Sequence, residues 1–230
     1  MKYKHVFFDL DRTLWDFEAN SHSTLEELFS IFKLKKKGIQ NADVFIRIYK
    51  THNEKLWGLY RAGKISQIDL RRERFQKTLA DFGIKDFALA EAIGEQYISI
   101  CPTKNKLFPF SIEVLEYLSK KYKLHIITNG FHKVQHVKLK FANLTKYFDA
   151  IITSEKVGVM KPDTKIFEFA LETANVKSSE SVYVGDDLEV DILGCQNSGM
   201  DGIYFNPKRE KHTEKVAFEI ACLSQLKELL

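Results

Sequence analysis

The sequence predicts an α/β protein: a Rossmann-like parallel sheet core with an inserted four-helix cap domain. Two observations support this prediction. Three short apolar runs, each followed at once by polar residues, resemble buried strands, and they begin near His5, Leu124 and Ser181. Between the first two runs, roughly 90 residues have the apolar spacing of helices. A helical insertion after the first strand of an α/β core accounts for both observations.

The helical segment contains four sets of apolar residues at helical spacing, separated by residues that interrupt helices. The sets begin near Leu25, Phe45, Leu70 and Leu89, and the interruptions fall at Gly38, Gly63, Gly83 and Pro102. Four amphipathic helices with short connections can form a small bundle with its own core. We therefore expect a helical cap domain over residues 15–106 and a core domain made of residues 1–14 and 107–230.

Strand and helix patterns alternate after Pro109. The expected elements are a helix over 110–121, a strand over 123–128, a helix over 131–141, a strand over 150–153, a helix over 163–174, a strand over 181–185, a helix over 188–198 and a strand over 202–205. This alternation implies right-handed crossovers and a parallel sheet covered on both faces. In such a sheet the carboxyl ends of the strands meet at one crevice, where ligands bind.

The composition is that of a soluble globular protein. Of 230 residues, 44% are hydrophobic and 29% are charged, and the net charge of +4 is too small to indicate a nucleic acid polymer as partner. Three distant cysteines indicate reduced thiols. No run approaches the roughly 20 apolar residues needed to cross a bilayer, and the run at Val6–Phe8 is too short for a secretion signal. We expect a cytoplasmic protein with no membrane partner.

Two carboxylates follow the first expected strand. Asp9 and Asp11 are two residues apart, so both side chains would point to the same side if the chain stayed extended. One carboxylate can then attack phosphorus to form an acyl phosphate, while the other acts as acid and base. The alternative is a turn capped by an aspartate, with Thr13 making a local hydrogen bond.

Two further motifs are suited to binding phosphate. Thr128, Asn129 and Gly130 lie where a strand gives way to a helix, and a helix start offers N–H groups to an anion. An ordinary helix start is the alternative. Lys161 precedes Pro162 and is therefore expected to be extended; it would neutralise charge on the nucleophile and the phosphoryl group. A solvated lysine is the alternative.

A third group of carboxylates follows the strand that ends at Gly185. Several carboxylates without a cluster of cysteine or histidine favour Mg²⁺ over zinc. We expect Asp186 to ligate the metal beside Asp9, Asp187 to face away or bind through water, and Asp191 to orient Lys161. Capping of the next helix is the alternative for Asp187 and Asp191.

With these motifs in this order, the chain resembles the haloacid dehalogenase (HAD) superfamily, in its phosphatase majority. The resemblance rests on Asp9-x-Asp11-x-Thr13, Lys161-Pro162 and Gly185-Asp186 and covers essentially the whole chain. It implies a helical cap and Mg²⁺, with Asp9 as nucleophile and Asp11 as acid and base that also offers its backbone carbonyl to the metal. It further implies that Thr128 and Lys161 hold phosphate, that Asp186 binds Mg²⁺ and that Asp191 supports the site.

A narrower resemblance is to the 5′-nucleotidases that act on pyrimidine nucleoside monophosphates. Its motifs are Leu56-Trp57-x-x-Tyr60-x-x-Gly63-x-Ile65, Arg74-Phe75, Thr128-Asn129-Gly130-Phe131, Ser154-Glu155-x-Val157-Gly158 and Lys161-Pro162-x-x-x-Ile166-Phe167. The expected substrate is therefore a small phosphate ester, most simply a nucleoside 5′-monophosphate.

Three alternatives remain open. Similar proteins hydrolyse sugar phosphates such as N-acylneuraminate 9-phosphate. A phosphomutase also uses both aspartates, and a catalytically silent HAD-fold binding module would need neither. True dehalogenases lack the second carboxylate, so Asp11 argues against that reaction. The sequence does not define an oligomeric state.

Overall fold

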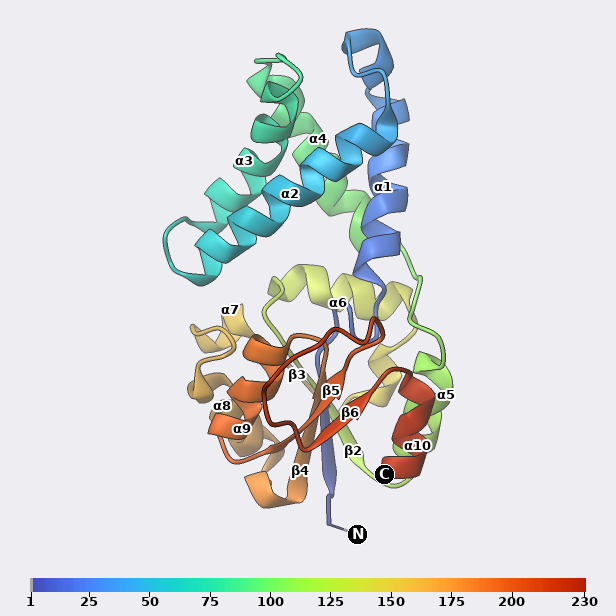
Figure 1. The fold of residues 1–230 in the computed structure, drawn as a ribbon, viewed down its shortest axis with the longest axis vertical. Helices are drawn as coiled ribbons and strands as arrows, with labels where there is room; N and C mark the ends of the chain where they lie inside the picture. The colour runs from blue at the N-terminus through green and yellow to red at the C-terminus, as the bar shows by residue number, and fades with distance from the viewer. Residues whose placement is uncertain (1) are drawn as a thin grey trace. The chain divides into compact units, whose positions relative to one another are not determined.

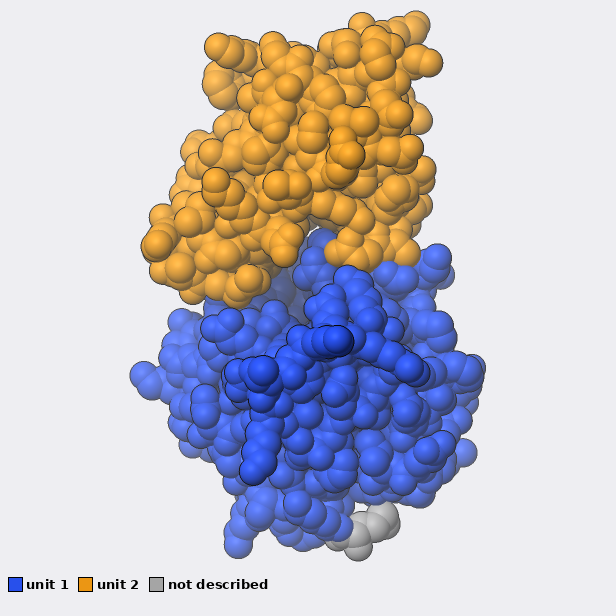
Figure 2. Space-filling model, in the orientation of Figure 1, with its two compact units in different colours: residues 1–17, 105–230 blue, residues 18–104 orange. Residues whose placement is uncertain are grey.

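The computed structural model describes residues 2–230 and separates into two compact units (Figures 1 and 2). Unit 1 comprises residues 1–17 and 105–230, and unit 2 comprises residues 18–104. Each unit has its own buried core. Among the described residues, no helix is both long and apolar enough to cross a membrane.

Unit 1 is built on a parallel sheet, as the sequence predicts. Across residues 2–230 its six strands lie in the order β3-β2-β1-β4-β5-β6, and every neighbouring pair is parallel. The strands are β1 (His5–Phe8), β2 (Lys123–Thr128), β3 (Ala150–Thr153), β4 (Ser181–Gly185), β5 (Asp201–Phe205) and β6 (Phe218–Ile220). The edge strand β6 was not expected, because three residues are too few to show an alternating pattern.

The register of the central strands brings the polar motifs to one edge of the sheet. Phe8 in β1 is level with Ile126 in β2 and Val184 in β4. Asp9 therefore leaves the sheet close to the point where β2 ends at Thr128 and β4 ends at Gly185. The reversal of strand order on either side of β1 makes this edge the expected ligand crevice.

Helices cover both faces of the sheet (Figure 1). The helices of unit 1 are α5 (Ser111–Leu118), α6 (His132–Phe141), α7 (Ser154–Val157), α8 (Thr164–Ala174), α9 (Gly194–Asn197) and α10 (Leu226–Leu229), with short 3₁₀ turns at Thr145–Tyr147, Ser178–Glu180 and Leu223–Gln225. Residues of α8 and α9 bury Phe7, Ile127 and Tyr183 on one face. Burial on both faces explains why the central strands read as continuous apolar runs.

One predicted helix has a different form. The sequence predicts an α-helix over 188–198, but Leu188–Leu193 forms a π-helix that continues into α9. The N–H of Ile192 donates to the carbonyl of Asp187, five residues earlier. Such wide turns occur frequently at functional sites, and here the turn includes Asp191.

Unit 2 contains four α-helices within the described residues, as expected, although the first helix begins at the end of unit 1. They are α1 (Phe17–Ile31), α2 (Ala42–Arg61), α3 (Gln67–Ala80) and α4 (Phe87–Ile100), joined in part by 3₁₀ turns at Leu34–Lys37 and Cys101–Thr103. The core brings together the rings of Tyr49, Phe75 and Tyr97, with centroids 4.8–5.6 Å apart. The exposed ends of α2 and α3 are capped by Asn41 and Ser66.

The boundary between the units differs slightly from the expected one. Trp15 forms an antiparallel bridge with Leu107, and the N–H of Asp16 donates to the carbonyl of Lys106 at 3.1 Å. These pairings fasten both connecting segments to unit 1. The helical unit consequently extends from Glu18 to Lys104 rather than from 15 to 106.

Candidate active site

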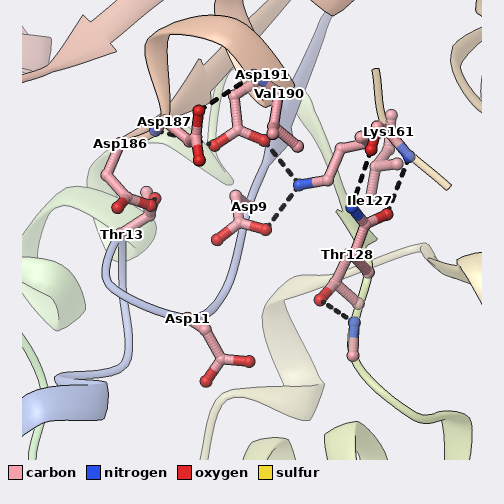
Figure 3. A network of polar contacts seen from close by, with 12 residues as sticks. Asp9, Asp11, Thr13, Ile127, Thr128, Lys161, Asp186, Asp187, Val190 and Asp191 are labelled. Atoms are coloured by element: carbon pink, nitrogen blue, oxygen red, sulfur yellow. Dashed lines mark hydrogen bonds and ion pairs between the residues drawn. The ribbon is translucent and has the colours of Figure 1, made fainter. Parts of the chain in front are cut away.

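At the carboxyl ends of the strands, where the ligand crevice is expected, a buried lysine is held between two carboxylates (Figure 3). The Nζ of Lys161 lies 2.6 Å from Oδ1 of Asp9 and 2.6 Å from Oδ1 of Asp191. It also donates to the hydroxyl of Tyr183 at 2.8 Å. Lys161 is only 2% exposed. A charge so deeply buried requires paired charges and hydrogen bonds, and Lys161 has both.

The pKa values of Asp9 and Lys161 depend on burial as well as on ion pairing. Burial raises the pKa of Asp9 to about 7, although Lys161 acts in the opposite direction. Burial by itself would lower the pKa of Lys161, but the carboxylates of Asp191 and Asp9 outweigh it and leave that pKa above its usual value. The ammonium is therefore charged at neutral pH.

The backbone of Lys161 is fixed by Asn129. The side-chain amide of Asn129 donates to the carbonyl of Lys161 at 3.0 Å and accepts from its N–H at 2.8 Å. The sequence predicts Asn129 as a phosphate-binding residue, and the structure shows its amide engaged at both ends. Its side chain therefore positions Lys161, and its amide nitrogen keeps a second hydrogen with which to donate to a phosphate.

Three carboxylates gather beside Lys161. Asp9, Asp186 and Asp191 each contribute an oxygen to a group whose members lie within 4.8 Å of one another. The hydroxyl of Thr13 donates to Oδ1 of Asp186 at 3.1 Å. Burial, together with the charges of Asp191 and Asp9, raises the pKa of Asp186 well above its usual value. Lys161 alone does not balance three carboxylates, so this oxygen-rich group fits a hard divalent cation such as Mg²⁺.

Asp191 and Asp187 have distinct structural roles. Asp191 accepts from Lys161 and Tyr183 through Oδ1 and from the N–H of Asp187 through Oδ2. A Cβ at Gly185 would lie 2.5 Å from this Oδ2, so only glycine fits there. Asp187 is exposed, and its Oδ1 accepts from the N–H of Val190 at 3.0 Å. Asp187 thus caps the π-helix, which is the alternative that the sequence left open.

Asp11 does not share the surroundings of Asp9. Its carboxylate points away from Asp9 (Figure 3) and lies 2.6 and 2.8 Å from the Nζ of Lys138. Gln135 also donates to Oδ2 of Asp11, at 2.8 Å. The chain turns just beyond β1, where the N–H groups of Leu14 and Trp15 both donate to the carbonyl of Leu10, so the extended geometry ends between the two carboxylates.

Thr128 is connected to the same group. Its Oγ1 accepts from Nε2 of Gln135 at 2.6 Å and from the N–H of Gly130 at 3.1 Å. A Cβ at Gly130 would lie 2.1 Å from Nε2 of Gln135. Glycine at position 130 therefore makes room for the side chain of Gln135.

Sequence reasoning missed three polar residues of this crevice: Gln135, Lys138 and Tyr183. Tyr183 lies in the middle of an apolar run and was assigned to packing. Gln135 and Lys138 are three residues apart on the helix that follows Thr128, a spacing that places both on one face. That spacing next to a phosphate-binding motif was the available signal.

The fold and this crevice together define a class of protein: an α/β protein with buried carboxylates and a buried lysine at the carboxyl ends of parallel strands. The model of the haloacid dehalogenase-like hydrolases matches residues 3–199. The chain therefore belongs to this hydrolase family, which confirms the resemblance drawn from its motifs.

Relatives of similar length sharpen the comparison. Pyrimidine 5′-nucleotidase YjjG of Escherichia coli is 33% identical, over 100% of this chain and 99% of that protein. Pyrimidine 5′-nucleotidase PynA of Streptococcus pneumoniae is 30% identical, over 93% of this chain and 89% of that protein. A glyceraldehyde 3-phosphate phosphatase of Methanothermobacter thermautotrophicus is 32% identical, over 99% of each.

A solved structure has the same fold over its full length. The HAD-hydrolase YfnB of Bacillus subtilis, described as bound to magnesium and as revealing interdomain movement, matches with a TM-score of 0.88 and 26% identity. The match covers 100% of this chain and 99% of that chain. The agreement extends through both units, so the helical insertion is shared.

Proposed function

We propose that the protein is a Mg²⁺-dependent phosphomonoester hydrolase that acts through an aspartyl phosphate on Asp9. The observation that carries the proposal is the buried Asp9–Lys161–Asp191 group, with both N–O distances at 2.6 Å. Its ammonium lies against one oxygen of Asp9, which leaves the other oxygen for attack on phosphorus. Membership of the hydrolase family supports the same chemistry.

In the proposed first step, a carboxylate oxygen of Asp9 attacks phosphorus and the bond from phosphorus to the ester oxygen breaks. Asp11 supplies the proton that the leaving oxygen takes up. In the second step, water attacks the phosphoryl group while Asp11 accepts its proton, and the bond from phosphorus to Asp9 breaks. Lys161 and the hydroxyl of Thr128 offset the charge on the phosphoryl oxygens.

The residues suited to hold Mg²⁺ are Asp9 and Asp186, with the backbone carbonyl of Asp11. When bound, the ion would offset negative charge shared by the phosphoryl group and the carboxylates. Thr13 orients Asp186 through its hydrogen bond of 3.1 Å. Asp191 already accepts three hydrogen bonds, so we assign it to support of Lys161.

We propose a nucleoside 5′-monophosphate as substrate, with pyrimidine nucleotides preferred. The two pyrimidine 5′-nucleotidases among the relatives support this choice, as does the resemblance of the motifs from Leu56 to Phe167. A sugar phosphate is the second candidate, and it is favoured by the glyceraldehyde 3-phosphate phosphatase with 32% identity.

We also propose that unit 2 is the cap domain that selects the substrate. The interdomain movement described for YfnB supports a cap that opens and closes. Closure would exclude water during phosphoryl transfer.

The cysteines at 101, 195 and 222 are free thiols, which supports a cytoplasmic location.

The test is phosphate release from thymidine and uridine monophosphates beside a panel of sugar phosphates, with Mg²⁺ and with a chelator. Mg²⁺-dependent hydrolysis with pyrimidine nucleotides ahead is the expected result. Faster hydrolysis of a sugar phosphate would support the proposed mechanism but would contradict the proposed nucleotide substrate. Isomerised product without free phosphate would indicate a phosphomutase, and no reaction with any ester would indicate a silent binding module.

A further inference from the structure

Helix α6 brings a buried ammonium to Asp11. Lys138 is 6% exposed, and its Nζ lies 2.6 and 2.8 Å from the two oxygens of Asp11. The same Nζ lies 4.5 Å from the ring centre of Trp15 and 6.0 Å from that of Phe17, within the range of cation–π attraction. Contact with both oxygens holds the Asp11 carboxylate in one orientation.

One turn earlier on α6, Gln135 connects Asp11 to Thr128. Its Nε2 lies 2.8 Å from Oδ2 of Asp11 and 2.6 Å from Oγ1 of Thr128. A carboxylate only accepts, so the amide nitrogen must face Asp11. Gln135 is fully buried, and its Oε1 has no hydrogen-bond partner among the described residues. An unpaired buried amide oxygen is uncommon, and here the two hydrogen bonds of Nε2 account for the orientation that leaves it unpaired.

These contacts determine how Thr128 can bond. Its Oγ1 accepts one hydrogen bond from Gln135 and another from the N–H of Gly130. A hydroxyl has two acceptor lone pairs and one proton. With both lone pairs engaged, the proton of Thr128 is left to donate outward, which is the role that a phosphate-binding hydroxyl requires.

We propose that Lys138 and Gln135 are positioning residues for phosphoryl transfer. Lys138 orients the acid and base Asp11, while Gln135 holds Asp11 and Thr128 in one frame and directs the Thr128 proton to the phosphate. The nucleophile and the leaving oxygen of a transferred phosphoryl group lie roughly in line. An acid that serves the leaving oxygen must therefore be held apart from Asp9, as Asp11 is. This inference rests on the proposed function.

The first test asks whether the effect of Lys138 on kcat depends on Asp11. Lys138→Met keeps most of the stem against Trp15 but removes the charge, and we expect kcat for the best ester to fall about 100-fold, as misplacement of a catalytic group does. In an Asp11→Asn background the same change should lower kcat by less than about twofold, because Lys138 acts through Asp11. Lys140→Met, on the exposed side of α6, is the matched control and should match the wild type.

A merely structural lysine gives a different result. It would lower kcat by the same factor in both backgrounds, or it would lower it no more than Lys140→Met does. Either result overturns the role of Lys138. Thermal unfolding of each variant shows whether a loss of kcat reflects a loss of fold.

The second test asks whether the effect of Gln135 on phosphate affinity depends on Thr128, and it does not require the enzyme to turn over. Calorimetry with inorganic phosphate as the probe should show Gln135→Leu weakening binding about tenfold, the effect of one misdirected hydrogen bond to a charged group. In a Thr128→Val background the same change should weaken binding by less than about twofold. Equal losses in both backgrounds overturn the role of Gln135.

The two tests separate this inference from the proposed function. If the wild type hydrolyses esters but the effects of Lys138→Met and Gln135→Leu do not depend on the background, the positioning roles are wrong and the proposed function stands. If the wild type hydrolyses none, the proposed function fails. The phosphate-binding test then still decides whether Gln135 directs Thr128.

Discussion

The crevice contains two buried lysines with different surroundings. Lys161 lies between the carboxylates of Asp9 and Asp191 and contacts the hydroxyl of Tyr183. Lys138 faces one carboxylate, that of Asp11, and its other neighbours are the rings of Trp15 and Phe17. The two aspartates that they contact are two residues apart in the motif but are held by different elements. A single short motif can therefore supply two carboxylates with separate surroundings.

The largest effect is expected on the Lys161 side. Asp9→Asn removes the proposed nucleophile, and kcat should fall by at least about 10⁴-fold, as removal of a nucleophile does in other hydrolases. The measurement is phosphate release with Mg²⁺ present. Folding should be unchanged, since asparagine keeps the shape of aspartate. Turnover within tenfold of the wild type would remove Asp9 from the mechanism.

Lys161→Met should lower both activity and stability. It leaves Asp9 and Asp191 as buried carboxylates without their ammonium, and removing one partner of a buried ion pair costs about 3–5 kcal/mol. Chemical denaturation of the metal-free variant measures this loss. A free energy of unfolding within about 1 kcal/mol of the wild type would show that the ammonium does not offset the buried charge.

Asp11→Asn tests the other side of the comparison. Asparagine cannot transfer the proton, so kcat should fall about 10²–10⁴-fold while the fold is retained. Pre-steady-state kinetics should show both the formation and the breakdown of the phosphoenzyme slowed. An unchanged rate in both steps would contradict the acid and base role.

Tyr183→Phe should have a smaller effect. Its hydroxyl accepts from Lys161 and donates to Asp191 or to the carbonyl of Ile127, at 2.8–3.1 Å. Loss of these bonds should lower the free energy of unfolding by about 1 kcal/mol. A companion change, Phe7→Leu in the same core, separates this loss from a packing defect. No change in stability or kcat would show that Asp9 and Asp191 suffice to hold Lys161.

The smallest effect on turnover is expected at His125, which lies inside the sheet and away from the strand ends that carry the motifs. His125 in β2 is buried against His5, and burial lowers the pKa of His125 from 6.5 to about 4. Below pH 6.5 the unfolded chain takes up a proton that the folded chain excludes, so stability falls as the pH drops towards 4. His125→Phe should remove up to about 3 kcal/mol of this acid sensitivity while leaving kcat unchanged. An identical pH dependence of unfolding in both proteins would contradict this account.

The strand ends and their motifs were predictable from the sequence, because buried parallel strands read as apolar runs and the polar residues follow them at once. Asp9 and Asp186, which directly follow β1 and β4, meet in the structure for this reason. The four helices of unit 2 were equally predictable from their periodicity.

Other features depended on tertiary contacts that no local pattern encodes. Asp11 pairs with Lys138 while Asp9 pairs with Lys161, and the π-helix of Leu188–Leu193 includes Asp191. In the sequence Tyr183 resembles a core residue, and only the structure shows that its hydroxyl lies beside Lys161. The roles of Gln135 and Lys138 required knowing which face of α6 meets the crevice.

The most direct test of the central claim is detection of the phosphoenzyme. The protein is mixed with its best ester and Mg²⁺, quenched in acid within one turnover, and examined by mass spectrometry of its peptides. We predict a phosphoryl group on Asp9 that is released by hydroxylamine and is absent from Asp9→Asn. Full turnover with no phosphoryl group on Asp9, and with Asp9→Asn still active, would contradict the account.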